Sequence, residues 1–271
     1  MESTPESDFA LAIAGRDHDV DLFGGAVAIA RLGRDSVDPH ALARELDLIA
    51  EAVRSRAGER AGNEALADAI GHELFEEGGF RGNREAYGDP ENSYLDRVLE
   101  RRLGLPITLS LVYLEVAERV GLECHGIGFP GNFLVRCGGE DGFFVDPFRG
   151  GARPTRDELR SQIERLADAG ASGEALLAAV TRRQILQRML LNLCAVYQQQ
   201  GDAPRWIAAL GLRLCLEPWN AALYLERGLL RYQQGIEELA LADLERYVDS
   251  GDPDPNPQAV RALDDLRSRL G

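Results

Sequence analysis

The sequence predicts an α+β protein that is mostly helical, with one small antiparallel sheet near its middle and an all-helical second half. A helical segment at 106–120 is apolar around most of its circumference, and three short extended segments follow it directly. A buried helix followed by antiparallel strands is an α+β arrangement. From residue 155 onward a helical pattern continues almost to the end of the chain and contains a weak 34-residue repeat.

The first 78 residues have a helical pattern in which two amphipathic helices stand out. Asp38 precedes Pro39, which predicts a capping aspartate before a proline at the first helical position. A second run, over 66–74, stops at Gly78 and Gly79. The apolar residues of the first helix recur at three- and four-residue spacing, at Leu42, Leu46, Ile49, Ala50 and Val53.

A loop-like segment over 79–93 leads to the buried helix. Ser93 and Asp96 resemble a capping box, so we expect Asn92 and Ser93 to cap a short helix over 94–102. Pro106 suits the first turn of the next helix, which Gly121 closes. Because apolar residues occupy most of the circumference of this helix, we expect it to be buried.

The three extended segments cover about 123–129, 132–137 and 142–146. Pro130 and Gly131 supply the first turn between them, and the glycine-rich stretch 138–142 supplies the second. Short segments joined by such turns predict antiparallel pairing.

The second half is expected to be a separate helical region. Thr155 and Glu158 form a capping box, so we divide the chain into 1–154 and 155–271. A 34-residue period is typical of tetratricopeptide repeats, and two repeats rarely close a core alone. We therefore expect helices near 156–185, or the N-terminal part, to cover them. The repeat joins Leu190, Cys194, Gly201 and Leu210 to Tyr224, Gly228, Gly235 and Leu244.

Repeats of this kind bind extended peptides or partner helices, so a protein or peptide partner is expected. Tyr197, Tyr224 and Tyr232, with Trp206 and Trp219, are candidate contacts. The alternative is that these aromatic side chains belong to the core, as most aromatic residues at helical spacing do.

Charge limits the classes of function. The formal net charge is −15, and all 30 basic residues are arginine. Because phosphate backbones are bound chiefly by basic surfaces, we expect no nucleic-acid partner. Without lysine, neither a Schiff base nor a Walker-type phosphate site can operate. His18, His40 and His72 show no metal-ligand spacing, so we expect no metal and no cofactor.

Cellular location is inferred from what the sequence lacks. No stretch reaches about 18 uninterrupted apolar residues, so we expect no membrane span. The N-terminus is acidic and polar, unlike a secretory signal, which favours the cytoplasm. The scattered cysteines form no CxxC pair and predict buried thiols in a reducing compartment. They are Cys124, Cys137, Cys194 and Cys215. No feature indicates the oligomeric state.

Three segments together resemble the bacterial SirB-type family. They are Gly88-Asp-Pro-Glu-Asn-Ser-Tyr-Leu-Asp-Arg-Val-Leu-Glu-Arg-Arg102, Gly104-Leu-Pro-Ile-Thr-Leu-Ser-Leu-Val-Tyr113, and Gly128-Phe-Pro-Gly-Asn-Phe-Leu-Val-Arg136 leading to Phe144-Val-Asp-Pro-Phe148. The resemblance covers most of the chain. It implies a transglutaminase/papain-like core followed by tetratricopeptide-like helices.

The resemblance also implies where an active site would lie. In active transglutaminase-like enzymes a cysteine begins the buried helix, a histidine follows on a strand, and an acidic residue follows on the next strand. The helix dipole and the imidazolium lower the thiol pKa, and the third residue orients the ring. Here the helix begins without cysteine, and Asn132 stands where related sequences usually have histidine. Asp146 alone remains, so the core is degenerate.

These losses favour a non-catalytic protein-binding or regulatory function. The alternative is a hydrolase or acyl transferase acting on amide or ester bonds through Ser110, Thr108 or Cys124. A hydroxyl needs a nearby base, which Asn132 cannot be, so Thr108 and Ser110 are more simply explained as capping or packing residues. Cys124 and His125 are neighbours on a strand, so their side chains should point to opposite faces of the sheet.

A locally basic patch lies within the motif region. Arg101 and Arg102, with Arg97, Arg136 and Arg149, could anchor a carboxylate or a phosphate, which arginine binds bidentately. The alternative is a set of salt bridges to the many carboxylates of the chain. Asn92 could also face the former active-site cleft instead of capping a helix.

Overall fold

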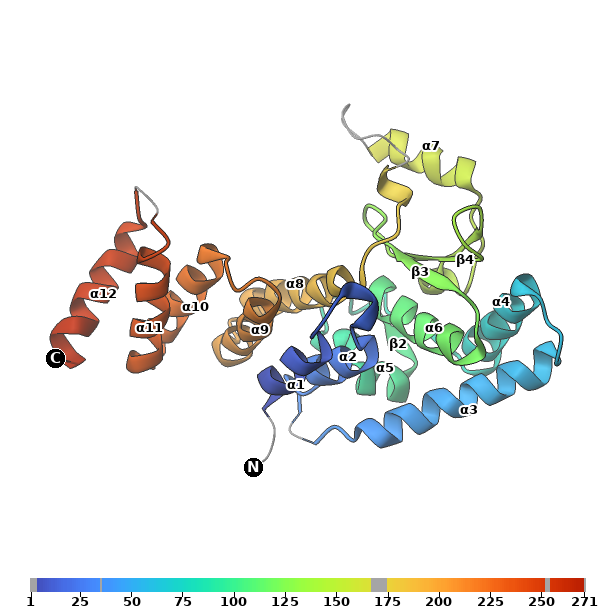
Figure 1. Cartoon of the computed structure of the whole chain (residues 1–271), viewed down its shortest axis with the longest axis horizontal. Coiled ribbons are helices and arrows are strands. Elements are labelled where there is room, and N and C mark those ends of the chain that lie inside the picture. The colour runs from blue at the N-terminus through green and yellow to red at the C-terminus, as the bar shows by residue number, and fades with distance from the viewer. Residues whose placement is uncertain (1–3, 35, 167–174, 252–253, 271) are drawn as a thin grey trace.

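The structure is a computed structural model that describes residues 4–34, 36–166, 175–251 and 254–270. The first three residues of the acidic N-terminus lie outside this description. Helix α6 (Pro106–Val120) lies at the centre of the larger part of the molecule (Figure 1). Pro106 occupies the first helical turn, and Gly121 ends the helix in the left-handed conformation at φ 77°. The helix is buried along most of its length, as its apolar circumference predicted.

Two N-terminal helices pack against α6 on one side. In α3 (Pro39–Ala57) the Asp38 carboxylate accepts hydrogen bonds from the N–H groups of His40 and Ala41, which confirms the predicted cap. α4 (Asn63–Gly71) continues into a π-helical turn, His72–Glu77, and this extension ends at Gly78. Leu46 and Val53 of α3 and Ile70 of α4 are fully buried in the main core.

A three-stranded antiparallel sheet covers the other side of α6. Its order is β3 (Cys124–Ile127), β4 (Leu134–Cys137) and β5 (Phe143–Val145), which confirms the predicted strands. Helix α7 (Arg156–Leu166) packs on the outer face of the sheet, and the expected Thr155–Glu158 capping box begins it. The cluster between α7 and the sheet consists of Ile127, Phe129, Leu134, Phe144, Leu159, Ile163 and Leu177.

The segment before α6 differs from the prediction. α5 (Leu95–Arg101) begins after Tyr94 without a side-chain cap, so the predicted capping box of Ser93 and Asp96 is wrong. Pro90–Ser93 instead form a short 3-10 helix, which Asp89 caps by accepting from the Glu91 N–H, and this earlier cap leaves Ser93 buried. A short parallel pair of strands, β1 (Arg81–Gly82) and β2 (Leu103–Gly104), was not predicted.

The helical array of the second half begins inside the core. α8 (Arg182–Gln200) contributes Leu186, Met189 and Leu193 to the main hydrophobic cluster and contacts α2 (Leu22–Ala30). α1 (Pro5–Ala12) contacts α9 (Ala203–Leu216), so N-terminal residues cover this end of the array, one of the two expected arrangements. The division of the chain at 154/155 stays a prediction.

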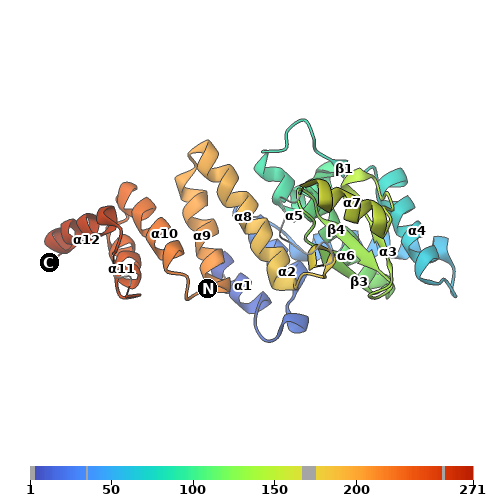
Figure 2. The ribbon, with the colours of Figure 1, turned by 90° about the horizontal axis from the view of Figure 1, so that it is seen from above.

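Three further helices extend the array away from the core (Figure 2): α10 (Ala221–Gln233), α11 (Glu237–Val248) and α12 (Pro257–Leu270). A Cβ at Gly228 would lie 2.9 Å from Leu244, which is the close helix crossing that the repeat requires. The tail has its own hydrophobic cluster, made of Ala240, Leu244, Tyr247, Ala259, Ala262, Leu263 and Leu266. None of the helices within the described residues is long and apolar enough to span a bilayer.

Two of the four cysteines are not free. Cys124 and Cys137 lie opposite each other on β3 and β4, with Cα atoms 4.3 Å apart, and they form a disulfide. The prediction of four thiols is therefore wrong for this pair, since only the strand register brings the two positions together. Cys194 and Cys215 are free, and burial raises the pKa of the Cys194 thiol to about 11.

Candidate functional site

The place where a transglutaminase-like enzyme would carry its nucleophile is a small pocket at the start of α6. The pocket has a volume of about 100 Å³. Helix α6, the turn before β4, the loop before α5, and α8 all contribute to it. Its lining residues are Tyr87, Pro106, Ile107, Gly131, Asn132, Phe133, Arg188 and Asn192.

Asn132 and Asp146 form the polar pair beside this pocket. The Asn132 Nδ2 donates to Asp146 Oδ2 at 2.8 Å, and its Oδ1 accepts from the Phe133 N–H at 2.8 Å. Asp146 also accepts from the Arg149 N–H. Burial raises the pKa of Asp146, although the hydrogen bonds from Asn132 and Arg149 oppose the rise. An amide in this position donates a hydrogen bond but cannot take a proton from a nucleophile.

Thr108 and Ser110 are fully buried and hold α6 to its neighbours. The Thr108 hydroxyl donates to the Asn92 carbonyl at 2.7 Å and accepts from the Leu105 N–H at 2.9 Å. The Ser110 hydroxyl donates to the Phe133 carbonyl at 3.3 Å. Neither side chain lines the pocket, so the structural role given to them above fits their contacts.

Cys124 is bonded to Cys137 and is therefore not a free thiol that could act as a nucleophile, one of the three candidates of the enzymatic alternative. His125, the next residue, lies 3.0 Å from the Glu123 carboxylate. Both residues line a second pocket, of about 340 Å³, to which Leu114 of α6 and Arg182 of α8 also contribute. Across the described residues there is no group of three or more His, Cys, Asp or Glu side chains that could hold a metal ion.

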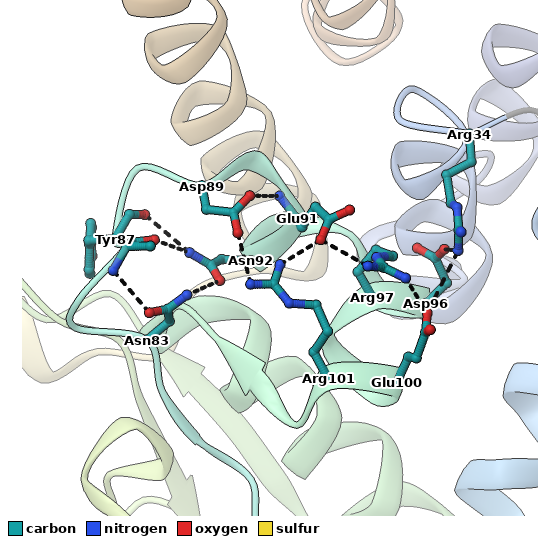
Figure 3. Close-up of polar contacts among 11 residues, drawn as sticks. Arg34, Asn83, Tyr87, Asp89, Glu91, Asn92, Asp96, Arg97, Glu100 and Arg101 are labelled. Carbon is teal, nitrogen blue, oxygen red and sulfur yellow. Dashed lines mark hydrogen bonds and ion pairs between the residues drawn. The ribbon is translucent and has the colours of Figure 1, made fainter.

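Asn92 fixes the loop that forms one edge of the first pocket (Figure 3). Its side chain is fully buried, donates to the Ala86 carbonyl at 2.7 Å and accepts from the Asn83 amide at 2.9 Å. Asn92 therefore neither caps the following helix nor faces the pocket. By fixing the loop it positions Tyr87, whose ring contacts Phe148 edge to face at 6.2 Å.

Four of the five arginines of the predicted basic patch, Arg97, Arg101, Arg102 and Arg149, form ion pairs. Arg136 is buried and has no carboxylate within 4.0 Å among the described residues. Arg101 lies between Asp89 and Glu91, 2.8 Å from each, and Figure 3 shows it fastening the loop to α5. Arg102 pairs with Glu45 at 2.8 Å and lies over the Phe80 ring. These contacts agree with the salt-bridge alternative and leave the anion-binding role of Arg101 and Arg102 without support.

Sequence reasoning missed Arg188. It lies on α8, outside the three motif segments, and lines the pocket beside Asn132. Its Nη2 donates to the Asn132 carbonyl at 2.9 Å, and its guanidinium lies over the Phe133 ring at 5.5 Å. No local pattern marks this arginine, because only the packing of α8 against the core brings it to the start of α6.

The tail aromatics divide into core and surface. Tyr197 is fully buried and its hydroxyl is hydrogen-bonded to that of Tyr94, which leaves the candidate binding role of Tyr197 without support. Tyr224 and Tyr232 are partly exposed, and their hydroxyls donate to the Pro218 carbonyl at 3.2 Å and to Asp265 at 2.7 Å. Trp219, at the turn before α10, is 77% exposed.

Comparison with known proteins agrees with this architecture. Residues 40–191 match the transglutaminase-like superfamily, and residues 193–267 match the tetratricopeptide repeat. A UPF0162 protein of Xylella fastidiosa (strain Temecula1) is 35% identical over 237 residues, which cover 86% of this chain and 84% of the relative. Protein SirB1 of Salmonella typhimurium is 24% identical over 70% of this chain and 71% of its own length.

A similar segment also occurs in a larger eukaryotic protein. F-box only protein 21 of Mus musculus is 31% identical over 207 residues, which are 69% of this chain but 32% of the relative. The likeness therefore concerns one part of that protein. No solved structure matches the chain.

Proposed function

The chain belongs to the transglutaminase-like superfamily, in the SirB-type family whose core is followed by tetratricopeptide repeats, and from this premise we propose that it is a non-catalytic protein that binds a protein or peptide partner. The core supplies a rigid body with a pocket at the start of α6. The tail supplies the second surface, since helical repeats of this kind bind extended peptides and partner helices.

The hydrogen bond from Asn132 to Asp146 carries the proposal. In an acyl-transfer site an imidazole would occupy this position, take a proton from the nucleophile and be oriented by the carboxylate. Here the amide donates to Asp146 at 2.8 Å, and the nearest hydroxyls of α6 are already hydrogen-bonded and buried. Without a thiol at the helix start, these groups support binding without turnover.

Two exposed apolar side chains of the tail allow a direct test of partner binding. Trp219 is 77% exposed and Leu239 is 51% exposed. Tagged full-length protein should retain a stoichiometric partner from an extract of its source cells, and Trp219→Ser or Leu239→Ser should reduce recovery at least several-fold. Leu48→Ser is the matched control, because Leu48 is 66% exposed on α3 of the core. Equal recovery with all three variants would move the binding surface to the core, and no stoichiometric partner at all would contradict the proposal.

A further inference from the structure

Arg188 is a half-buried cation without an anionic partner. Its hydrogen bond to the Asn132 carbonyl and its contact with the Phe133 ring involve neutral groups. Among the described residues no carboxylate oxygen lies within 4.0 Å of its guanidinium nitrogens. Many other arginines of this acidic chain are paired, as Arg101 is with Asp89 and Glu91. Burying a charge without a partner is costly, so the surroundings of Arg188 favour an added anion.

The pocket beside Arg188 has the size and the side chains to accept a small anionic group. Its volume of about 100 Å³ corresponds to about three waters of the liquid. Asn192 lies four residues after Arg188 on α8, so the two side chains share one face of the helix. Both line the pocket, and the part of the chain that the structure describes contains no hydrogen-bond partner for the Asn192 amide. Phe133 and Ile107 provide apolar walls.

The charge around the pocket favours a monoanion. One guanidinium matches the two oxygens of a carboxylate, and an amide can add one further hydrogen bond. A phosphate dianion would need more positive charge than the single pocket arginine supplies. The pocket residue Asn132 is also hydrogen-bonded to the Asp146 carboxylate, in a chain whose formal net charge is −15.

We propose that the pocket binds a carboxylate group of a peptide ligand, with Arg188 as the anion-binding residue and Asn192 as a second donor. The inference rests on the proposed function, since the carboxylate is held there and is not turned over. The carboxylate can be a chain terminus or an acidic side chain, and the two sources can be distinguished.

The test uses the full-length protein and four small probes, with binding measured by titration calorimetry or ligand-observed NMR. N-acetylglycine carries a terminal carboxylate, N-acetylglycinamide is its neutral analogue, and inorganic phosphate is the competing anion. We expect saturable binding of N-acetylglycine that is at least tenfold tighter than binding of the amide or of phosphate. Comparison with N-acetylaspartyl amide then assigns the preference to a side chain or to a terminus.

Variants assign the binding to the pocket. Arg188→Gln should weaken N-acetylglycine binding at least tenfold, and Arg188→Lys should weaken it less, because lysine keeps the charge but not the two-pronged geometry. Arg261→Gln, at an exposed arginine of α12, is the matched control and should bind as the wild type does. Asn192→Asp offers Arg188 an internal carboxylate and should also abolish binding. This variant provides the test if Arg188→Gln fails to fold.

Equal binding of acid and amide, or wild-type affinity in Arg188→Gln or in Asn192→Asp, would overturn the inference. Tighter binding of phosphate would overturn the carboxylate assignment. Hydrolysis of N-acetylglycinamide would contradict the proposed function instead, and would leave the tenfold effect of Arg188→Gln on binding intact.

Discussion

Asn132 places an amide beside the buried carboxylate of Asp146. The amide Nδ2 donates to the carboxylate at 2.8 Å. Its own oxygen accepts from the Phe133 N–H, so both ends of the amide are used. The side chain thereby satisfies a buried carboxylate without providing a base.

Asp146 makes stability depend on pH in a defined direction. Because its pKa is raised in the folded state, the folded protein binds more protons than the unfolded chain between the ordinary aspartate pKa of about 3.9 and the raised value. The free energy of unfolding of the wild type, relative to Asp146→Asn, should therefore fall as pH rises through this window. Urea titrations of both proteins from pH 3 to pH 7 measure the difference, and a rise with pH would contradict the assignment.

The disulfide predicts how many cysteine thiols are free to react. In denaturant without reductant, two thiols should react with iodoacetamide, those of Cys194 and Cys215, and after reduction four should react. Intact mass spectrometry counts the additions. Cys137→Ser is the control, because it should free Cys124 and give three additions without reductant. Four additions to the unreduced wild type, purified without reductant, would show that the cross-strand pair does not form the bond.

At the scale of elements, the site depends on the loop over 83–93 and its attachment to α6. Asn92 holds the loop through Ala86 and Asn83, and its carbonyl accepts from Thr108 of α6. Arg101 holds the same loop from α5. These contacts place Tyr87 at the pocket edge, so the loop is as much a part of the site as the helix.

Replacing Asn92 should loosen this loop. Asn92→Ala removes three side-chain hydrogen bonds, to Asn83 and to the carbonyls of Ala86 and Tyr87, so we expect a loss of about 2–4 kcal/mol in the free energy of unfolding. Urea denaturation measures the loss, and limited proteolysis should cut within 83–93 sooner than in the wild type. Glu85→Ala, at an exposed position of the same loop, should change stability by less than about 0.5 kcal/mol. Equal effects of the two variants would contradict the anchoring role.

Elements encoded by local sequence could be predicted, and contacts between distant segments could not. The cap at Asp38, the buried helix from Pro106 to Gly121 and the three strands follow from short-range patterns. The disulfide depends on the register of β3 with β4, and Arg188 reaches the pocket only because α8 packs on the core. The predicted cap at Ser93 is wrong because Asp89, a residue type that also caps helices, begins a short 3-10 helix four residues earlier.

At the scale of the molecule, the tail is joined to the core through α8 and α9 but has its own cluster and its own buried charges. Asp243 of α11 is 4% exposed and accepts from Arg227 and Arg231 of α10, each at 2.7 Å. One carboxylate thus joins the two helices that form the second repeat.

Removing this carboxylate should destabilise the tail before the core. Asp243→Ala leaves two partly buried guanidinium groups without this partner, so we expect a loss of about 3–5 kcal/mol. In Asp243→Ala, amide hydrogen exchange should accelerate relative to the wild type more in α10–α12 than in α3 and α6. Glu238→Ala, an exposed position on α11, should leave exchange unchanged. Uniform acceleration across core and tail would contradict the separate stability of the tail.

The central claim is that the transglutaminase-like core binds without catalysis, and covalent labelling tests it most directly. Folded full-length protein should react with a fluorophosphonate hydroxyl probe no more than the heat-denatured protein does, because Thr108 and Ser110 are buried and hydrogen-bonded. Stoichiometric labelling of the folded protein that is lost in Ser110→Ala or Thr108→Ala would contradict the claim and identify a working nucleophile.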